Sequence, residues 1–169
     1  MNGIDILYYG HETVKTAVAD LSDNGWQMTG VCGHWSIKEI IDHLASYEQL
    51  LIEVLTGLLE DAPLTPTLDR LLRDDVQFND DEVVLRGDLT VAESWLAYET
   101  AHETAVSLLA KIPLEGQRLK GTLPWYGDDY DLEDFLVYTY YGHKREHCAQ
   151  IAVFRSAKED TPAAMSLQR

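Results

Sequence analysis

The strongest constraint on the fold is the apolar pattern of residues 36–60, which is typical of one long amphipathic helix. Apolar residues recur at spacings of three, four and seven, which places them on one helical face: Ile37, Ile40, Ile41, Leu44, Leu51, Leu55 and Leu58. The stretch opens on "SIKE", a capping box in which Ser36 accepts from the amide of Glu39 while the Glu39 side chain reaches back to Ser36. Two prolines in "DAPLTPTLD" then end the helix.

Three further stretches have the same character. Residues 2–21 form the first, residues 90–111 open on a second capping box, "TVAE", and residues 131–157 open on Asp131, a favourable N-cap residue. No segment alternates strictly enough to require a strand. Four amphipathic helices of about 20–25 residues predict an all-α four-helix bundle.

The connections between these helices are less regular. Residues 22–35 are expected to form a glycine-containing loop, and residues 68–88 are compatible with a short helix plus a turn at Asn79. The longest break in periodicity is residues 113–131, which hold three glycines and two prolines. Such long loops are uncommon in a compact domain and often serve as a lid or a binding loop, so either role is possible here.

The chain has 169 residues, which predicts one domain, residues 1–160, followed by a flexible tail at residues 161–169. Apolar residues make up 46% of it, enough for a sizeable core, but no apolar run approaches the roughly 20 residues of a membrane span. The N-terminal residues lack the pattern of a signal peptide, so a cytoplasmic protein is expected. Cys32 and Cys148 are then expected to be free thiols.

The net charge of −16, from 29 acidic and 13 basic residues, argues against two classes of partner. Nucleic-acid binding depends on lysine and arginine neutralising phosphates, and anionic membrane surfaces attract basic segments. We therefore expect no nucleic acid and no membrane among the partners. A homodimer formed through a helix face is compatible with a bundle, but the sequence does not fix one.

The last predicted helix carries two histidines one turn apart. They belong to a stripe that begins and ends with apolar residues: Leu132, Leu136, Thr139, His143, His147, Gln150 and Phe154. Such a stripe should face the core, where buried polar groups cost free energy unless they are satisfied. Imidazoles at positions i and i+4 can converge on one metal ion or can be hydrogen-bonded core groups, and the spacing alone does not separate these interpretations.

A metal site would need a third ligand, and four other histidines are available. His34 lies in a loop, and His11 and His102 have acidic neighbours that are compatible with solvated faces. His43 lies at the flank of the apolar stripe of residues 36–60, and facing side chains at core edges build metal sites in helical bundles. His43 is therefore the preferred third ligand.

Two stretches together resemble the DinB-like superfamily, a group of four-helix-bundle proteins of the DinB/YfiT-like type. They are "HWSIKEIIDHLASYEQ", with a Trp-Ser start and an internal His-Leu, and "YGHKREHCAQI", with His-x-x-x-His followed by Gln-Ile. The resemblance implies an up-down-down-up bundle and a divalent metal, nickel or zinc, held by His43, His143 and His147. Within the superfamily, "FNDDEVVLRGDLT" resembles the ClbS/DfsB branch, which does not uniformly keep the three histidines.

The resemblance implies two alternative functions. One is a metal-dependent enzyme of the detoxification type, a hydrolase or an S-transferase that uses a low-molecular-weight thiol, acting on a small-molecule substrate. The other is a metal-free binding protein of the self-protection type. Gln150 is expected to contact a ligand histidine, and Glu146 to orient one, to act as a base or to form a helix-surface salt bridge. Several aromatic residues could line a pocket under the loop of residues 113–131: Tyr47, Tyr140, Tyr141, Trp125 and Tyr126.

Overall fold

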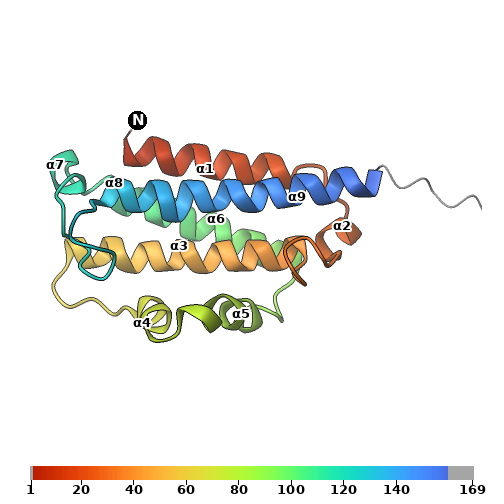
Figure 1. Ribbon diagram of the computed structural model, residues 1–169, viewed down its shortest axis with the longest axis horizontal. Helices are drawn as coiled ribbons and strands as arrows, with labels where there is room; N and C mark the ends of the chain where they lie inside the picture. Colours follow the sequence, from red (N-terminus) through yellow and green to blue (C-terminus); the bar gives the residue numbers. More distant parts are fainter. Residues whose placement is uncertain (1, 160–169) are drawn as a thin grey trace, which may run out of the picture.

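The computed structural model describes residues 2–159. All regular secondary-structure elements in this range are helices. Its frame consists of four long helices: α1 (Gly3–Val18), α3 (Ile37–Leu59), α6 (Val91–Leu109) and α9 (His143–Glu159). α1 and α9 run in one direction and α3 and α6 in the other, which is the up-down-down-up arrangement (Figure 1). The predicted all-α bundle is therefore confirmed, whereas the predicted tail at residues 161–169 lies outside the described residues. Within the described part of the chain, none of the helices is long and apolar enough to cross a membrane.

The parallel course of α3 and α6 requires a connection that returns the chain along the bundle. Two short helices provide it, α4 (Pro66–Arg73) and α5 (Asp75–Leu85), and both pack on α3 (Figure 1). The predicted turn at Asn79 is wrong, because Asn79 lies within α5 and the break falls at Asp74. The side chain of Asp74 caps α5 by accepting from the amide of Gln77 at 3.1 Å.

The long helices begin where their capping residues stand. Ser36, Thr90 and Asp131 each accept a hydrogen bond from the amide three residues later, and the acidic side chain at that later position returns to the cap backbone. Each such cap contributes about 1 kcal/mol to the stability of its helix. The predicted capping boxes at Ser36 and Thr90 and the N-cap at Asp131 are therefore confirmed.

The last long helix is not one uniform α-helix, as residues 131–157 were predicted to be. It begins as α8 (Leu132–Phe135), widens into a π-helical segment, η1 (Leu136–Gly142), and continues as α9. π-Helical turns are rare and often lie beside functional sites. This one ends immediately before His143.

Two apolar clusters fill the bundle, and a buried polar layer lies between them. One cluster surrounds Leu50, Leu51 and Leu55, and the other surrounds Ile37, Ile40 and Ile41. The polar layer takes one residue from each long helix: His11 from α1, Glu48 from α3, His102 from α6 and Lys144 from α9.

The burial of His11 and His102 corrects the expectation that they lie on solvated faces. Their exposed fractions are only 7% and 6%. Successive residues of a helix point about 100° apart, so an acidic neighbour in the sequence does not place a histidine on the solvent face.

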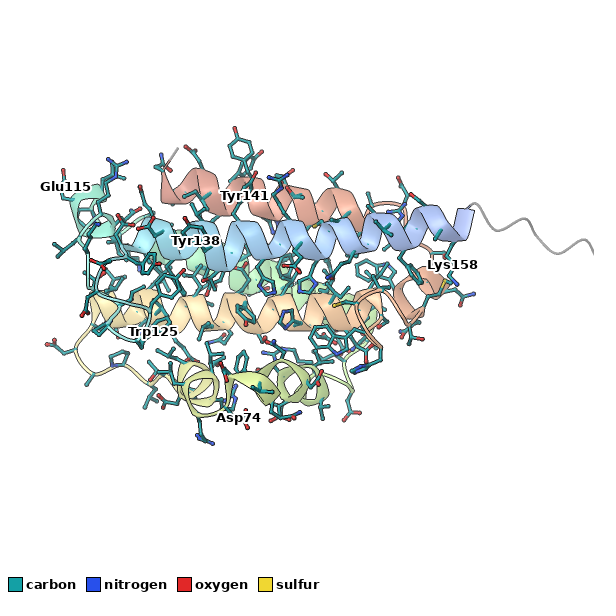
Figure 2. All side chains as sticks on the ribbon, viewed as in Figure 1. Asp74, Glu115, Trp125, Tyr138, Tyr141 and Lys158 are labelled. Carbon is teal, nitrogen blue, oxygen red and sulfur yellow. The ribbon has the colours of Figure 1, made fainter. Side chains whose placement is uncertain are left out.

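The two long connections each contain a short helix, α2 (Asp23–Gln27) and α7 (Leu114–Gln117). In the second, Trp125 and Tyr126 pack against Phe135, with ring centroids 5.4 Å and 4.9 Å from it. Figure 2 shows Trp125 near the end of α3, at the end of the bundle where this connection folds. Both aromatic residues therefore complete the apolar cluster at that end, and the expectation that they line a substrate pocket gains no support from these contacts.

Candidate metal site

Three histidine side chains from two helices converge midway along the bundle. Nε2 of His43 on α3 lies 2.8 Å from Nε2 of His143 on α9, and that atom lies 2.9 Å from Nε2 of His147. The ligand nitrogens of the three residues all lie within 4.8 Å of one another. Over residues 2–159, this is the one group of three or more histidine, cysteine or acidic side chains with metal-ligand spacing.

His143 lies at the edge of the buried face of α9, whereas His147 is as buried as Cys148. The most buried positions of this helix include Lys144, Cys148 and Ile151, which are one position round from the predicted stripe. His147 is buried, whereas His143 and Gln150 are half-buried. The site therefore lies where α9 faces α3, with the His143 side partly open.

A neighbouring side chain determines which nitrogen of His147 is free. Oε1 of Gln150 lies 2.8 Å from Nδ1 of His147, and because an amide oxygen only accepts, His147 carries its proton on Nδ1 and its lone pair on Nε2. A hydrogen bond to the backbone of Thr139 raises the pKa of His143, against the larger lowering by desolvation. The Nε2 lone pair of His147 then faces Nε2 of His143 at 2.9 Å, a position in which a shared cation would be stabilised.

The spacing and chemistry of these donors fit a divalent transition metal. Two nitrogens that are each about 2.0–2.1 Å from one zinc ion lie about 2.9–3.4 Å apart at bond angles of about 90–110°. The two Nε2–Nε2 contacts of 2.8 Å and 2.9 Å lie close to this range. Imidazole is a favourable ligand for zinc and nickel, so the three residues could hold either ion.

Burial keeps the three imidazoles neutral, which is the form that binds metal. Desolvation lowers the pKa of His43 to about 2 and the pKa of His143 to about 4, and in both cases the neighbouring imidazoles add to the effect. Desolvation also lowers the pKa of His147, against smaller opposing effects of Gln150 and Glu146. At neutral pH, an incoming cation would therefore not have to displace protons from these rings.

Two aromatic rings enclose His43, and α5 holds both of them. The ring centroids of Trp35 and Tyr47 each lie 4.9 Å from that of His43. Trp35 donates its indole N–H to Asp80 at 3.1 Å, and Tyr47 donates its hydroxyl to Asn79 at 3.3 Å. The crossover helix therefore positions the walls of the site.

Sequence reasoning missed Asn79 and Asp80. They are 32 and 45 residues away from the aromatic residues that they hold. No local pattern marks such pairs, since both acceptors occur in an acidic stretch that is equally compatible with a solvated surface.

The remaining predicted site residues occupy different positions. Tyr140 is buried and donates its hydroxyl to the backbone carbonyl of Tyr47 at 3.1 Å, so it braces the site from within the core. Glu146 is exposed and, across the described residues, has no ion pair, so the expected surface salt bridge is not found. Burial raises the pKa of the Cys32 thiol, and the negative charge of the Glu146 carboxylate raises it further.

An apolar groove of about 610 Å³ runs along the exposed side of α9. Val31, Val153 and Phe154 are among its lining residues. Glu146 and Gln150 also line it, and Gln150 makes the hydrogen bond to His147. One end of the groove therefore lies beside the histidine cluster.

A family model of the DinB superfamily matches residues 7–151, a range that includes all three histidines. The chain belongs to the DinB superfamily. No curated protein and no solved structure matches it. A three-histidine cluster in a DinB superfamily bundle fits a metal site.

Proposed function

We propose that this protein is a metal-dependent enzyme that acts on a small molecule, by hydrolysis or by transfer to a low-molecular-weight thiol. The observation that carries the proposal is the convergence of three neutral, largely buried imidazoles through their Nε2 atoms. Zinc or nickel held by three imidazoles lowers the pKa of a bound water or thiol towards neutrality and so supplies a nucleophile.

The surrounding residues have separate roles in this proposal. Gln150 holds His147 in the tautomer that presents Nε2, as partners beyond the ligands usually do in metal sites. Trp35 and Tyr47 cover His43, whose exposed fraction is 2%, and so exclude water from that side. Access is left on the side of the half-buried His143.

The groove along α9 indicates the substrate class. Its walls are mainly apolar, and Glu146 is a lining residue beside the histidine cluster. A carboxylate there, on a protein with a net charge of −16, disfavours phosphate and carboxylate groups. We therefore propose a neutral or cationic substrate with an apolar body.

The test is the metal content of protein purified without an affinity tag, for the wild type and for His143→Ala. The wild type should carry stoichiometric zinc or nickel, or take it up on addition, and melt at a higher temperature when loaded. His143→Ala should lose both properties. His34→Ala is the matched control, because the His34 side chain is 78% exposed and lies outside the cluster.

Product formation then separates the two reactions. Hydrolysis proceeds without added thiol, whereas S-transfer to an electrophile requires it. Protein that takes up no zinc or nickel at all would contradict the metalloenzyme proposal and leave a metal-free binding protein as the better explanation of the fold.

A further inference from the structure

The three histidines depend on two helices that pack mainly on other partners. α3 packs chiefly on α6, and α9 chiefly on α1. His43 lies on α3, whereas His143 and His147 lie on α9. The separation of α3 and α9 therefore has to be set by a few direct contacts between them.

One of these contacts is a buried ion pair. Nζ of Lys144 contacts Oε1 of Glu48, and the two side chains are 2% and 0% exposed. Lys144 directly follows His143, and Glu48 lies five residues after His43, so the pair is within about two turns of all three imidazoles.

The pair is held in turn by the other two long helices. On α6, Nδ1 of His102 lies 3.4 Å from Oε2 of Glu48, and the ring of His11 on α1 stacks on His102 with centroids 3.9 Å apart. Gly10 on α1 leaves room for the stem of Lys144, because a Cβ at that position would lie 3.3 Å from its Cδ. Glu48 and Lys144 are therefore fixed from all four sides of the bundle.

Stability alone does not explain a buried lysine at this point. Apolar side chains of similar size often stabilise a core at least as well as a buried ion pair does. Apolar packing is non-directional, however, and lets helices shift by small distances, whereas an ammonium on one carboxylate oxygen fixes their spacing. Metal ligands must be held within about 0.5 Å of their working geometry.

We propose that the Glu48–Lys144 ion pair sets the spacing and rotation of α3 and α9, and that Lys144 is a positioning residue for the three-histidine site. This inference rests on the proposed metal-dependent function. It assigns the polar layer between the two apolar clusters a role in arranging the ligands, rather than in binding the ion or the substrate.

The test separates positioning from folding with the double variant Glu48→Leu/Lys144→Met. Removing both charges leaves no unpaired buried charge, although Nδ1 of His102 loses its contact with Glu48, so the variant should fold and unfold at a denaturant concentration close to that of the wild type. Its zinc dissociation constant, measured by competition with a chromophoric chelator, should nevertheless rise about 10–100-fold, as for other residues that support metal ligands. The visible spectrum of bound cobalt should change as well, because it reports the arrangement of the ligands.

Lys38→Met is the matched control for the single variant Lys144→Met. Lys38 is also a buried lysine paired with a buried carboxylate, Asp42 at 2.7 Å, but both lie on α3 and do not reach α9. Both single variants should lose stability, and only Lys144→Met should weaken zinc binding. If the double variant does not fold, this pair decides the question.

Two results would overturn the inference, and they differ from each other. A folded double variant, or a folded Lys144→Met, with the wild-type zinc affinity and cobalt spectrum would show that the ion pair does not position the ligands, while leaving the metal site intact. A wild-type protein that binds no zinc, nickel or cobalt would instead remove the metal-site proposal and this inference with it.

Discussion

The side-chain amide oxygen of Gln150 lies 2.8 Å from Nδ1 of His147, and His147 precedes Gln150 by about one turn of α9. This contact fixes the tautomer of the imidazole, because the amide oxygen has no proton to give. The nitrogen aimed at His143 is then the one with the lone pair. The Gln150 that follows the His-x-x-x-His motif thus has a physical role in the site.

Gln150→Ala should weaken metal binding without unfolding the protein. The imidazole of His147 would then be free to rotate and to exchange tautomers, and loss of such a partner typically lowers metal affinity about 10–100-fold. A competition titration with zinc measures the change. Gln77→Ala, at an exposed glutamine on α5, is the control and should retain the wild-type affinity. Equal affinities of the two variants would show that the hydrogen bond to His147 does not matter.

The metal-free protein should lose stability as the pH falls from 7 to 5. Desolvation lowers the pKa of His11 to about 3, of His43 to about 2 and of His143 to about 4. Between these values and about 6.5, the unfolded chain binds protons that the native protein does not, so acid favours unfolding. Each histidine should account for about 1–2 kcal/mol of the loss by pH 5.

Urea denaturation in the presence of a chelator, at pH 7 and pH 5, measures this loss. His11→Gln removes one of the buried imidazoles without touching the metal cluster, so the variant should lose about 1–2 kcal/mol less than the wild type over the same interval. A wild-type stability that stays constant between the two pH values would contradict the proposed neutral state of these side chains.

Local signals in the sequence were enough to predict the bundle. The capping residues Ser36, Thr90 and Asp131 and the apolar periodicity act over a few residues, so their consequences can be read along the chain. The cluster of His43 with His143 needed a different kind of signal, since a separation of 100 residues has no local pattern. The position of His43 at the edge of its apolar stripe favoured it as the third ligand, and the resemblance to the superfamily then implied the full set of three.

Other features could not be predicted because they depend on tertiary packing. Lys144 is a residue type that is almost never buried unless it is paired, and its partner Glu48 lies on another helix. The π-helical segment Leu136–Gly142 likewise depends on contacts between elements. The same holds for the hydrogen bond from Trp35 to Asp80. The sequence shows each of these residues but does not show which residue it contacts in the fold.

The stability of the α4–α5 crossover should depend on one carboxylate of α3. Glu53 is buried and accepts hydrogen bonds from the amides of Thr67 at 2.9 Å and Leu68 at 2.9 Å, at the start of α4. Glu53→Gln removes the charge from these bonds and should destabilise the protein by about 1–3 kcal/mol. Hydrogen exchange should accelerate in residues 66–85 more than in α1. Glu60→Gln, at an exposed position at the end of α3, is the control, and an identical exchange pattern in both variants would contradict the prediction.

Tyr140→Phe should lower stability more than the same change at Tyr138, two residues earlier in the π-helical segment. The hydroxyl of Tyr140 is a second direct link to α3, donating to the carbonyl of Tyr47 at 3.1 Å, whereas Tyr138 is 64% exposed. Losing a buried hydrogen bond should cost about 0.5–1.5 kcal/mol, while Tyr138→Phe should stay within about 0.5 kcal/mol of the wild type. The difference is measured as a shift in the urea midpoint at constant slope. Equal midpoints for the two variants would mean that the Tyr140 hydroxyl does not brace η1 against α3. The Glu48–Lys144 ion pair and the His43–His143 contact would then be the polar contacts described above that link the two histidine-bearing helices.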